Sequence, residues 1–208
     1  MRPDAAGAPK RGKPPGLTEK QIVDAALSII SAEGLDALSM RRLSRELGRS
    51  AMAAYSHVAD KQQLLDLVAR EVLSEVEVPA PDSAPWEDRL RAVIDAIDER
   101  LRHYPGIAEV LFARMQSADR RIILGIMEIL LSAGFPDTDV VLGYAMVHTY
   151  LYGRYQVVLR AEDRPPADID SDLERLLSHL PQLRGHDFFA FGVDTLIEGL
   201  RSRLAADR

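Results

Sequence analysis

The sequence contains no cysteine among its 208 residues, which excludes disulfide bonds and thiolate chemistry. The longest uncharged segment, residues 140–153, holds a histidine and three tyrosines, so it is too short and too polar to span a bilayer. The first sixteen residues contain no apolar run and do not resemble a signal peptide. We therefore expect a cytoplasmic protein that does not insert into a membrane.

The sequence also lacks the motifs that usually accompany catalysis. It contains no glycine-rich phosphate-binding loop and no nucleophile elbow. Four histidines lie outside the N-terminal third of the chain, and their spacing does not suit a metal site: His103, His148, His179 and His186. We expect no enzymatic activity, no bound metal and no cofactor.

No segment alternates polar and apolar residues with the period of a strand, whereas the helical period recurs along most of the chain. The fold class predicted is therefore all-α. Helix starts are signalled by a capping box at Thr18 and Gln21 and by polar residues at Ser39, Ser50 and Asp60. The helix that follows Asp60 should run to about Val78.

Proline, glycine and charge divide the chain into four parts. Residues 1–16 should form a disordered basic arm, residues 17–78 a first helical domain with a connecting helix at its end, residues 79–85 a linker, and residues 86–208 a second helical domain. In the arm, Lys10, Arg11 and Lys13 either aid solubility or enter a minor groove, as other N-terminal arms do.

The net charge of −6 is unevenly distributed. Residues 1–73 hold eleven lysines and arginines against nine acidic residues, and the remainder holds fifteen against twenty-three. This asymmetry suits an N-terminal part that meets a polyanion while an acidic body does not. Local imbalances of this size also arise by chance.

Residues 39–57 have the spacing of a helix-turn-helix, with a serine before each short helix and Gly48 at the turn. Leu43, Leu47 and Ala54 can supply the small core of such a unit. The second helix would then enter a major groove, because its alanines allow the backbone to approach DNA closely.

Residues 17–68, LTEKQIVDAALSIISAEGLDALSMRRLSRELGRSAMAAYSHVADKQQLLDLV, resemble the N-terminal DNA-binding domain of the tetracycline-repressor (TetR) family. The order of motifs carries the resemblance: a helix, EG, LSMRRLSRELG, a serine-led helix with Y-x-H, then DK and a leucine pair. The segment FFAFGVDTLIEGL resembles the last helix of many members by a looser pattern. The resemblance implies a homodimer whose last two long helices pair between subunits.

The resemblance also implies roles for single residues. Arg41 matches an arginine before the turn that often contacts DNA, Tyr55 and His57 match the aromatic residue and the histidine of the recognition helix, and Lys61 matches the lysine that opens the fourth helix. Lysine, glycine and threonine are frequent where this sequence has Ala51, Met52 and Ala53, and larger residues are frequent at Ser56 and Val58. The candidate DNA-binding residues are Arg41, Arg49, Ser50, Ala51, Met52, Ala53, Tyr55, Ser56, His57 and Lys61.

Two of these assignments have structural alternatives. Tyr55 can pack its ring inside the three-helix core with only its hydroxyl exposed, and the arginines of residues 41–45 can form a solvated helix face. Helical spacing places Arg41 and Arg45 on one face and Arg42 elsewhere, so Arg41 is the first candidate for a DNA contact.

The segment 139–159 is apolar on nearly all sides, so we expect a helix buried on several sides. One face should pack on a partner subunit while the other lines a cavity. One stripe consists of Tyr144, His148, Tyr152 and Tyr155, and the opposite one of Met146, Tyr150, Gly153 and Val157. The candidate ligand-binding residues are Met115, Met127, Tyr144, His148 and Tyr152. Core residues with satisfied hydroxyls are an equal alternative for the tyrosines.

The function expected is that of a transcriptional regulator, a repressor that a small, largely apolar effector releases from double-stranded DNA bearing an inverted-repeat operator. Two other classes remain open. One is a helical ligand carrier or enzyme that keeps a helix-turn-helix shape. The other is a transcriptional activator or a protein-recruiting adaptor on DNA.

Overall fold

The computed structural model describes residues 17–113, 120–160, 171–179 and 185–206, and every regular element in these ranges is helical. The fold class predicted from the sequence is confirmed. The elements are α1 (Glu19–Glu33), the 3₁₀ turn η1 (Leu35–Ala37), α2 (Met40–Glu46), α3 (Ala51–Tyr55), α4 (Lys61–Ser74), α5 (Trp86–His103), α6 (Ile107–Ala113), α8 (Arg120–Ala133), α9 (Asp137–Arg160), α10 (Ser171–Leu177) and α11 (Gly185–Ala206).

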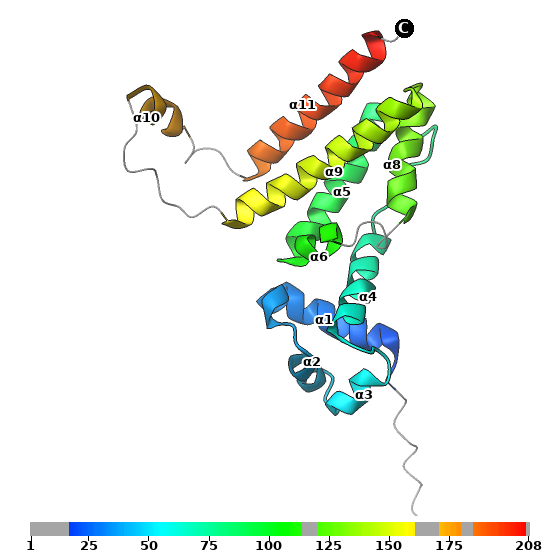
Figure 1. Ribbon diagram of the computed structural model, residues 1–208, viewed down its shortest axis with the longest axis vertical. Coiled ribbons are helices and arrows are strands. Elements are labelled where there is room, and N and C mark those ends of the chain that lie inside the picture. Colours follow the sequence, from blue (N-terminus) through cyan, green and yellow to red (C-terminus); the bar gives the residue numbers. More distant parts are fainter. Residues whose placement is uncertain (1–16, 114–119, 161–170, 180–184, 207–208) are drawn as a thin grey trace, which may run out of the picture.

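Helices α1 to α4 form one end of the molecule (Figure 1). Three of their starts are capped as the sequence predicts. Thr18 and Gln21 form a capping box at α1, the Ser39 hydroxyl accepts from the Arg42 amide at 3.1 Å, and Asp60 accepts from the Gln63 amide at 2.7 Å. These caps fix where the helices begin, because each satisfies an amide that has no partner within its helix.

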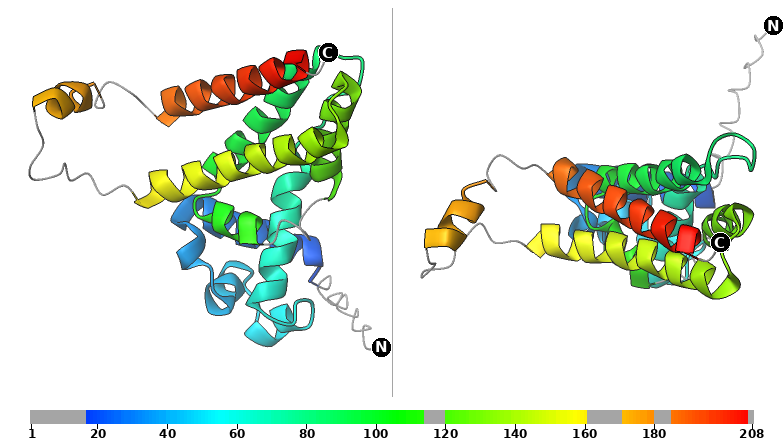
Figure 2. Two further views of the ribbon diagram at one scale, coloured as in Figure 1. Left: turned by 45° about the horizontal axis from the view of Figure 1, so that its top comes forward. Right: turned by 90° about the horizontal axis from the view of Figure 1, so that it is seen from above.

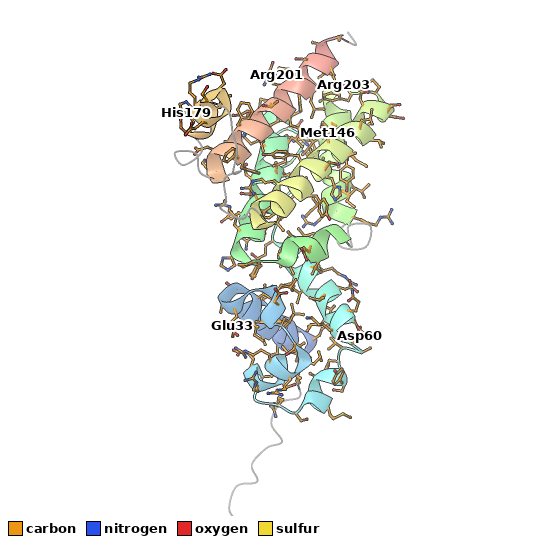
Figure 3. All side chains as sticks on the ribbon, turned by 60° about the vertical axis from the view of Figure 1, so that its left-hand side comes forward. Glu33, Asp60, Met146, His179, Arg201 and Arg203 are labelled. Carbon is orange, nitrogen blue, oxygen red and sulfur yellow. The ribbon has the colours of Figure 1, made fainter. Side chains whose placement is uncertain are left out.

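Helices α5, α8, α9 and α11 form the other end (Figures 1 and 2). Helices α9 and α11 lie side by side and run in opposite directions (Figure 2). Asp139 at the start of α9 accepts from Arg203 near the end of α11 at 2.9 Å, and the Tyr150 hydroxyl donates to the Phe189 carbonyl near the start of α11 at 3.0 Å. Arg203 and Met146 lie at this end of the molecule, whereas Asp60 lies at the other (Figure 3).

Polar and close contacts join the two ends around the end of α4. The Arg121 guanidinium on α8 donates to the carbonyls of Val76 at 2.6 Å and Leu73 at 3.0 Å. Glu75 pairs with Arg100 on α5. A Cβ at Gly125 of α8 would lie 2.7 Å from the Val78 side chain, so α8 and the segment after α4 pack closely there.

A second junction joins η1, the turn that follows α1, to the turn between α5 and α6. The Leu35 amide donates to the Pro105 carbonyl at 3.1 Å. Gly106 has a φ of 86°, and a Cβ there would lie 2.8 Å from the Leu35 Cβ. Only glycine suits this position, since the left-handed backbone and the close approach both disfavour a side chain.

One expectation drawn from the sequence needs correction. Helix α4 ends at Ser74 rather than near Val78, because its last carbonyls accept from Arg121 and the chain then turns. Within one chain, helix α9 leaves Val141, Leu142 and Met146 more than half exposed, and the expected packing of one of its faces on a partner subunit stays a prediction.

Within the described residues, no helix is both long enough and apolar enough to cross a membrane.

Candidate nucleic-acid interface

The turn between α2 and α3 is a tight connection built around Gly48. Gly48 has a φ of 59°, a left-handed conformation that glycine adopts readily. The Arg49 amide donates to the Ser44 carbonyl at 3.1 Å, which folds the turn back onto the end of α2. The sequence-based prediction of a glycine turn between two short helices is confirmed.

The inner and outer sides of this unit differ sharply. Leu43, Ala54 and Val58 are fully buried, and Leu47 packs partly buried against them. In contrast, the side chain of Met52 is 78% exposed and that of Tyr55 is 46% exposed. The alternative in which the Tyr55 ring packs inside the core is therefore wrong. Met52 and Tyr55 are available to a partner molecule.

Three arginines and Tyr55 line an open groove between α2 and α3. Arg41 and Arg45 come from α2 and Arg49 from the turn, and Tyr55 closes the groove from α3. Within the described residues, none of the three arginines forms an ion pair with a carboxylate. The three guanidinium groups and the Tyr55 phenol are exposed to solvent. A groove with this charge and an aromatic hydroxyl suits the phosphates of a nucleic acid.

Arg42, between two of these arginines in the sequence, has a different role. Its guanidinium donates to Glu33 at 2.6 Å and to Glu46 at 2.7 Å, and these bonds raise the pKa of Arg42 and lower that of Glu33. Arg42 thus ties α2 to α1 instead of facing a ligand. The expectation that Arg41 and Arg45 share a face while Arg42 points elsewhere is confirmed.

The remaining candidates surround α3. Ser50 precedes the helix and its side chain makes no capping hydrogen bond. The Ser56 hydroxyl, just after the helix, donates to the Ala53 carbonyl at 2.8 Å, while Ala53 itself is partly buried. His57 is exposed beyond the helix and Lys61 is exposed at the first position of α4.

The structure does not describe the positions of two predicted site residues or of the N-terminal arm. The side chain of Ala51, all of Met115, and Lys10, Arg11 and Lys13 lie outside the described residues.

The predicted ligand-binding residues of α9 form a ladder along that helix. The rings of Tyr144 and His148 are stacked with centroids 6.4 Å apart, and those of His148 and Tyr152 with centroids 6.5 Å apart. Burial lowers the pKa of His148 and raises that of Tyr144, so both side chains are neutral at pH 7. Met127 on α8 is partly buried against the core.

Tyr155, expected on the same stripe, lies in a different environment. It is 7% exposed, and its hydroxyl donates to Asp98 of α5 at 2.7 Å. Burial and this bond raise its pKa. The residue is part of a polar cluster beneath α11 and not of the ladder.

Among the described residues, no group of three or more histidine, aspartate or glutamate side chains could hold a metal ion.

Comparison with known proteins agrees with the geometry of the groove. The model of the bacterial regulatory proteins of the tetR family matches residues 22–68, which include α2, the turn and α3. The chain is 29% identical to the transcriptional repressor DrrR1 of Streptomyces coeruleorubidus over 236 residues, covering 99% of this chain and 85% of DrrR1.

Three solved structures resemble most of the chain. Apo ActR from Streptomyces coelicolor has a TM-score of 0.79 and 28% identity, covering 93% of this chain and 99% of ActR. ActR in complex with actinorhodin gives a TM-score of 0.73 and 29% identity, with coverage of 89% and 96%. BioQ is a protein of Mycobacterium smegmatis. Its structure in complex with its double-stranded DNA operator has a TM-score of 0.66 and 26% identity, covering 89% of this chain and 99% of BioQ.

The chain belongs to the TetR family. It is therefore a DNA-binding transcriptional regulator, and its relatives include the transcriptional repressor DrrR1 and the class D tetracycline repressor protein of Escherichia coli. In this TetR-family protein the arginine groove lies on the unit that the family model covers.

Sequence reasoning missed Arg45 as a groove residue and missed the cluster around Asp98. Arg45 carried a signal, since it shares a helical face with Arg41. Asp98 carried none, because its partners Arg154 and Tyr155 lie more than fifty residues away in the sequence.

Proposed function

We propose that this protein is a homodimeric repressor that a small, largely apolar effector releases from an inverted-repeat operator. The observation that carries the proposal is the groove in which Arg41, Arg45 and Arg49 meet Tyr55. With Met52 exposed beside it, α3 can place apolar surface against thymine methyls while the arginines hold phosphates.

An uncovered apolar face on α9 and α11 supports the homodimer. Val141, Leu142 and Met146 on α9 and Phe188 and Phe191 on α11 are each about half exposed or more, the last by 75%. Exposed apolar side chains on two neighbouring helices suit an interaction site, and a second copy of the chain would cover them symmetrically in a twofold dimer. Two recognition units are thereby presented to two half-sites.

The aromatic ladder on α9 supports an effector site. Tyr144, His148 and Tyr152 place polar tips on a largely apolar helix, which is how small-molecule pockets orient a ligand. Met127 on α8, a helix that packs on α9, offers adaptable apolar surface in the same domain. The structure of ActR with actinorhodin shows a relative of the same fold that binds a small molecule.

Helix α4 can transmit the effect of a ligand. Its start adjoins α3, and its end is held by Arg121 of α8 and, through Glu75, by Arg100 of α5. A ligand that prefers a different placement of α8 or α5 therefore also prefers a different placement of α3, and that preference weakens operator binding. A coupling of about 1–3 kcal/mol would be typical of such linkage.

The proposal assigns no catalytic step to the protein and places it in the cytoplasm with the DNA that it reads. It also assigns DNA reading to residues 17–78 and ligand binding and dimerisation to residues 86–208, with residues 79–85 as the linker and residues 1–16 as a basic arm.

Selection of bound duplexes from a random library tests DNA reading directly. We expect the purified dimer to enrich an inverted repeat whose half-sites lie about one helical turn apart or more. Enrichment of no sequence, or of a single unrepeated site, would contradict the proposal. A reporter placed behind the enriched sequence should be silenced by the protein, whereas increased expression would make it an activator.

Release by an effector is tested with His148→Leu, which removes the imidazole at similar volume. A compound that releases wild-type protein from the enriched duplex should release this variant only at higher concentration, while operator affinity without ligand is unchanged. Equal sensitivity of both proteins would place the effector on another face.

A further inference from the structure

Helix α3 exposes an apolar side chain, that of Met52, at the DNA-reading end of the molecule. This end lies opposite α11 (Figure 1). Ala54 is fully buried and Ala53 is partly buried, whereas the Met52 side chain is 78% exposed. Met52 is therefore the residue of α3 that has most apolar surface to lose when a partner binds there.

The helix has none of the side chains that read base edges through paired hydrogen bonds. Its five residues are alanine, methionine, alanine, alanine and tyrosine. Arginine, lysine, asparagine, glutamine and the carboxylates make the hydrogen bonds that distinguish guanine, adenine and cytosine in a major groove. The Tyr55 hydroxyl belongs to the arginine groove, and the Ser56 hydroxyl after the helix already donates to the Ala53 carbonyl at 2.8 Å. Apolar contact is thus the means by which α3 itself can read a base.

The arginine groove identifies the partner of Met52 as DNA. Arg41, Arg45 and Arg49 line this groove together with Tyr55. Met52 and Tyr55 are three residues apart, so they lie on neighbouring positions of one side of the helix. A duplex whose phosphates bind the arginines therefore brings the base edges of its major groove to Met52.

The base edges of a major groove offer a single kind of apolar group, the methyl at C5 of thymine. 5-Methylcytosine has the same methyl at the same ring position, whereas uracil and unmodified cytosine have a hydrogen there. Methionine has three rotatable bonds and a polarizable sulfur, so it adapts its shape to such a group. The chemistry of Met52 thus matches a 5-methylpyrimidine and is indifferent to which of the two bases presents the methyl.

We propose that Met52 reads the C5 methyl group of one pyrimidine in each operator half-site, and that 5-methylcytosine takes the place of thymine there. The protein then distinguishes methylated from unmethylated cytosine in DNA. This inference rests on the proposed function, since it requires α3 to lie in the major groove of the operator.

The first experiment replaces the thymines of the selected operator by deoxyuridine, one symmetric pair at a time. This change removes the methyl group and leaves base pairing and every hydrogen-bonding group in place. Loss of one buried methyl changes affinity about fourfold, so one symmetric pair should weaken binding of the dimer about 15-fold. Unchanged affinity at every pair, or selected half-sites without thymine, would overturn the proposal.

Substitutions of Met52 show whether this side chain reads the methyl. Met52 is exposed, so Met52→Ala should fold like the wild type, and its preference for thymine over uracil should disappear. Met52→Leu keeps an apolar side chain and should retain most of the preference. Tyr55→Phe is the matched control on the same helix, because it removes only a hydroxyl of the groove and should weaken binding of both duplexes by the same factor. A preference that persists undiminished in Met52→Ala would overturn the proposal.

The second experiment asks whether methylation of cytosine restores the contact. Two duplexes have, at the position found with deoxyuridine, either cytosine or 5-methylcytosine paired with guanine in both half-sites. Methylation should strengthen binding of the wild type by a similar factor of about 15 and have no effect on Met52→Ala. Methylation that leaves wild-type affinity unchanged, or lowers it, would contradict the recognition of 5-methylcytosine.

Failure of this inference is distinguishable from failure of the proposed function. If the wild type selects no duplex at all, the proposed function is contradicted. If it binds a selected operator with an affinity that does not depend on the methyl groups, only the role of Met52 is overturned.

Discussion

Arg121 offers a quantitative test of how the two ends of the molecule are joined. Its guanidinium donates to the carbonyls of Val76, Leu73 and Ser74 at 2.6, 3.0 and 3.4 Å. These carbonyls follow or end α4, where helical carbonyls have no partner within the helix. Arg121→Met keeps most of the apolar length of the side chain and removes every donor.

The size of the effect follows from these contacts. A hydrogen bond to a charged donor contributes about 1.5–3 kcal/mol when well buried. Arg121 is exposed and only its bond to Val76 is partly buried, so we expect a total loss of about 1–2 kcal/mol after solvent screening. For a chain of this size each kcal/mol lowers Tm by about 2–4 °C. The expected fall is therefore about 2–8 °C.

Thermal unfolding followed by circular dichroism measures this shift. All samples must have the same protein concentration, because dimerisation makes Tm concentration-dependent. Arg120→Met is the matched control, since Arg120 is an exposed arginine on the same helix that makes none of these bonds to α4. If Arg121→Met and Arg120→Met unfold at the same temperature, Arg121 does not hold the end of α4.

Three further changes test other parts of the structure. Gly192→Ala should destabilise the fold by about 1–3 kcal/mol in urea unfolding, because its Cβ would overlap the Tyr150 ring where α9 and α11 cross. Asp98→Ala should lower stability by about 3–5 kcal/mol, since it leaves the Arg154 guanidinium buried without its carboxylate. Met146→Glu should convert the dimer to a monomer in size-exclusion chromatography with light scattering, because a charge then lies on the proposed interface.

Each of these changes has a control elsewhere in the chain. Gly199 on α11 has no atom within 4 Å of an added Cβ, so Gly199→Ala should not destabilise. Asp88→Ala is the control for Asp98→Ala, because it removes an exposed carboxylate from the same helix, α5. Leu131→Glu is the control for Met146→Glu, because it places the same charge on an apolar residue of α8 that is 50% exposed. If a variant and its control lose the same stability, or if both become monomeric, the contact named for that variant is not the cause.

Local features of the structure could be predicted from the sequence because their causes are local. The caps at Thr18, Ser39 and Asp60 each depend on residues at most three positions apart. The turn at Gly48 likewise depends on the one residue type that readily takes a positive φ.

Features that depend on distant partners could not be predicted. The apolar pattern of α9 does not distinguish a side covered by its own chain from one such as Met146 that remains exposed. Tyr155 shares a helical stripe with Tyr152 in the sequence, yet its hydrogen bond to Asp98 places it in a polar cluster apart from the ladder. The end of α4 at Ser74 depends on Arg121, which is more than forty residues away.

The most direct test of the central claim compares Arg41→Ala and Arg42→Ala on the selected operator over a series of salt concentrations. Arg41 lines the open groove, whereas Arg42 is bound to Glu33 and Glu46. Losing one phosphate contact in each subunit should weaken binding by about 1–3 kcal/mol per contact and flatten the slope of log K on log salt by about 0.9 for each contact. Arg42→Ala should leave the slope unchanged at a temperature where it is folded. Equal slopes for wild type and Arg41→Ala, or a flatter slope for Arg42→Ala alone, would contradict the assignment of this groove to DNA.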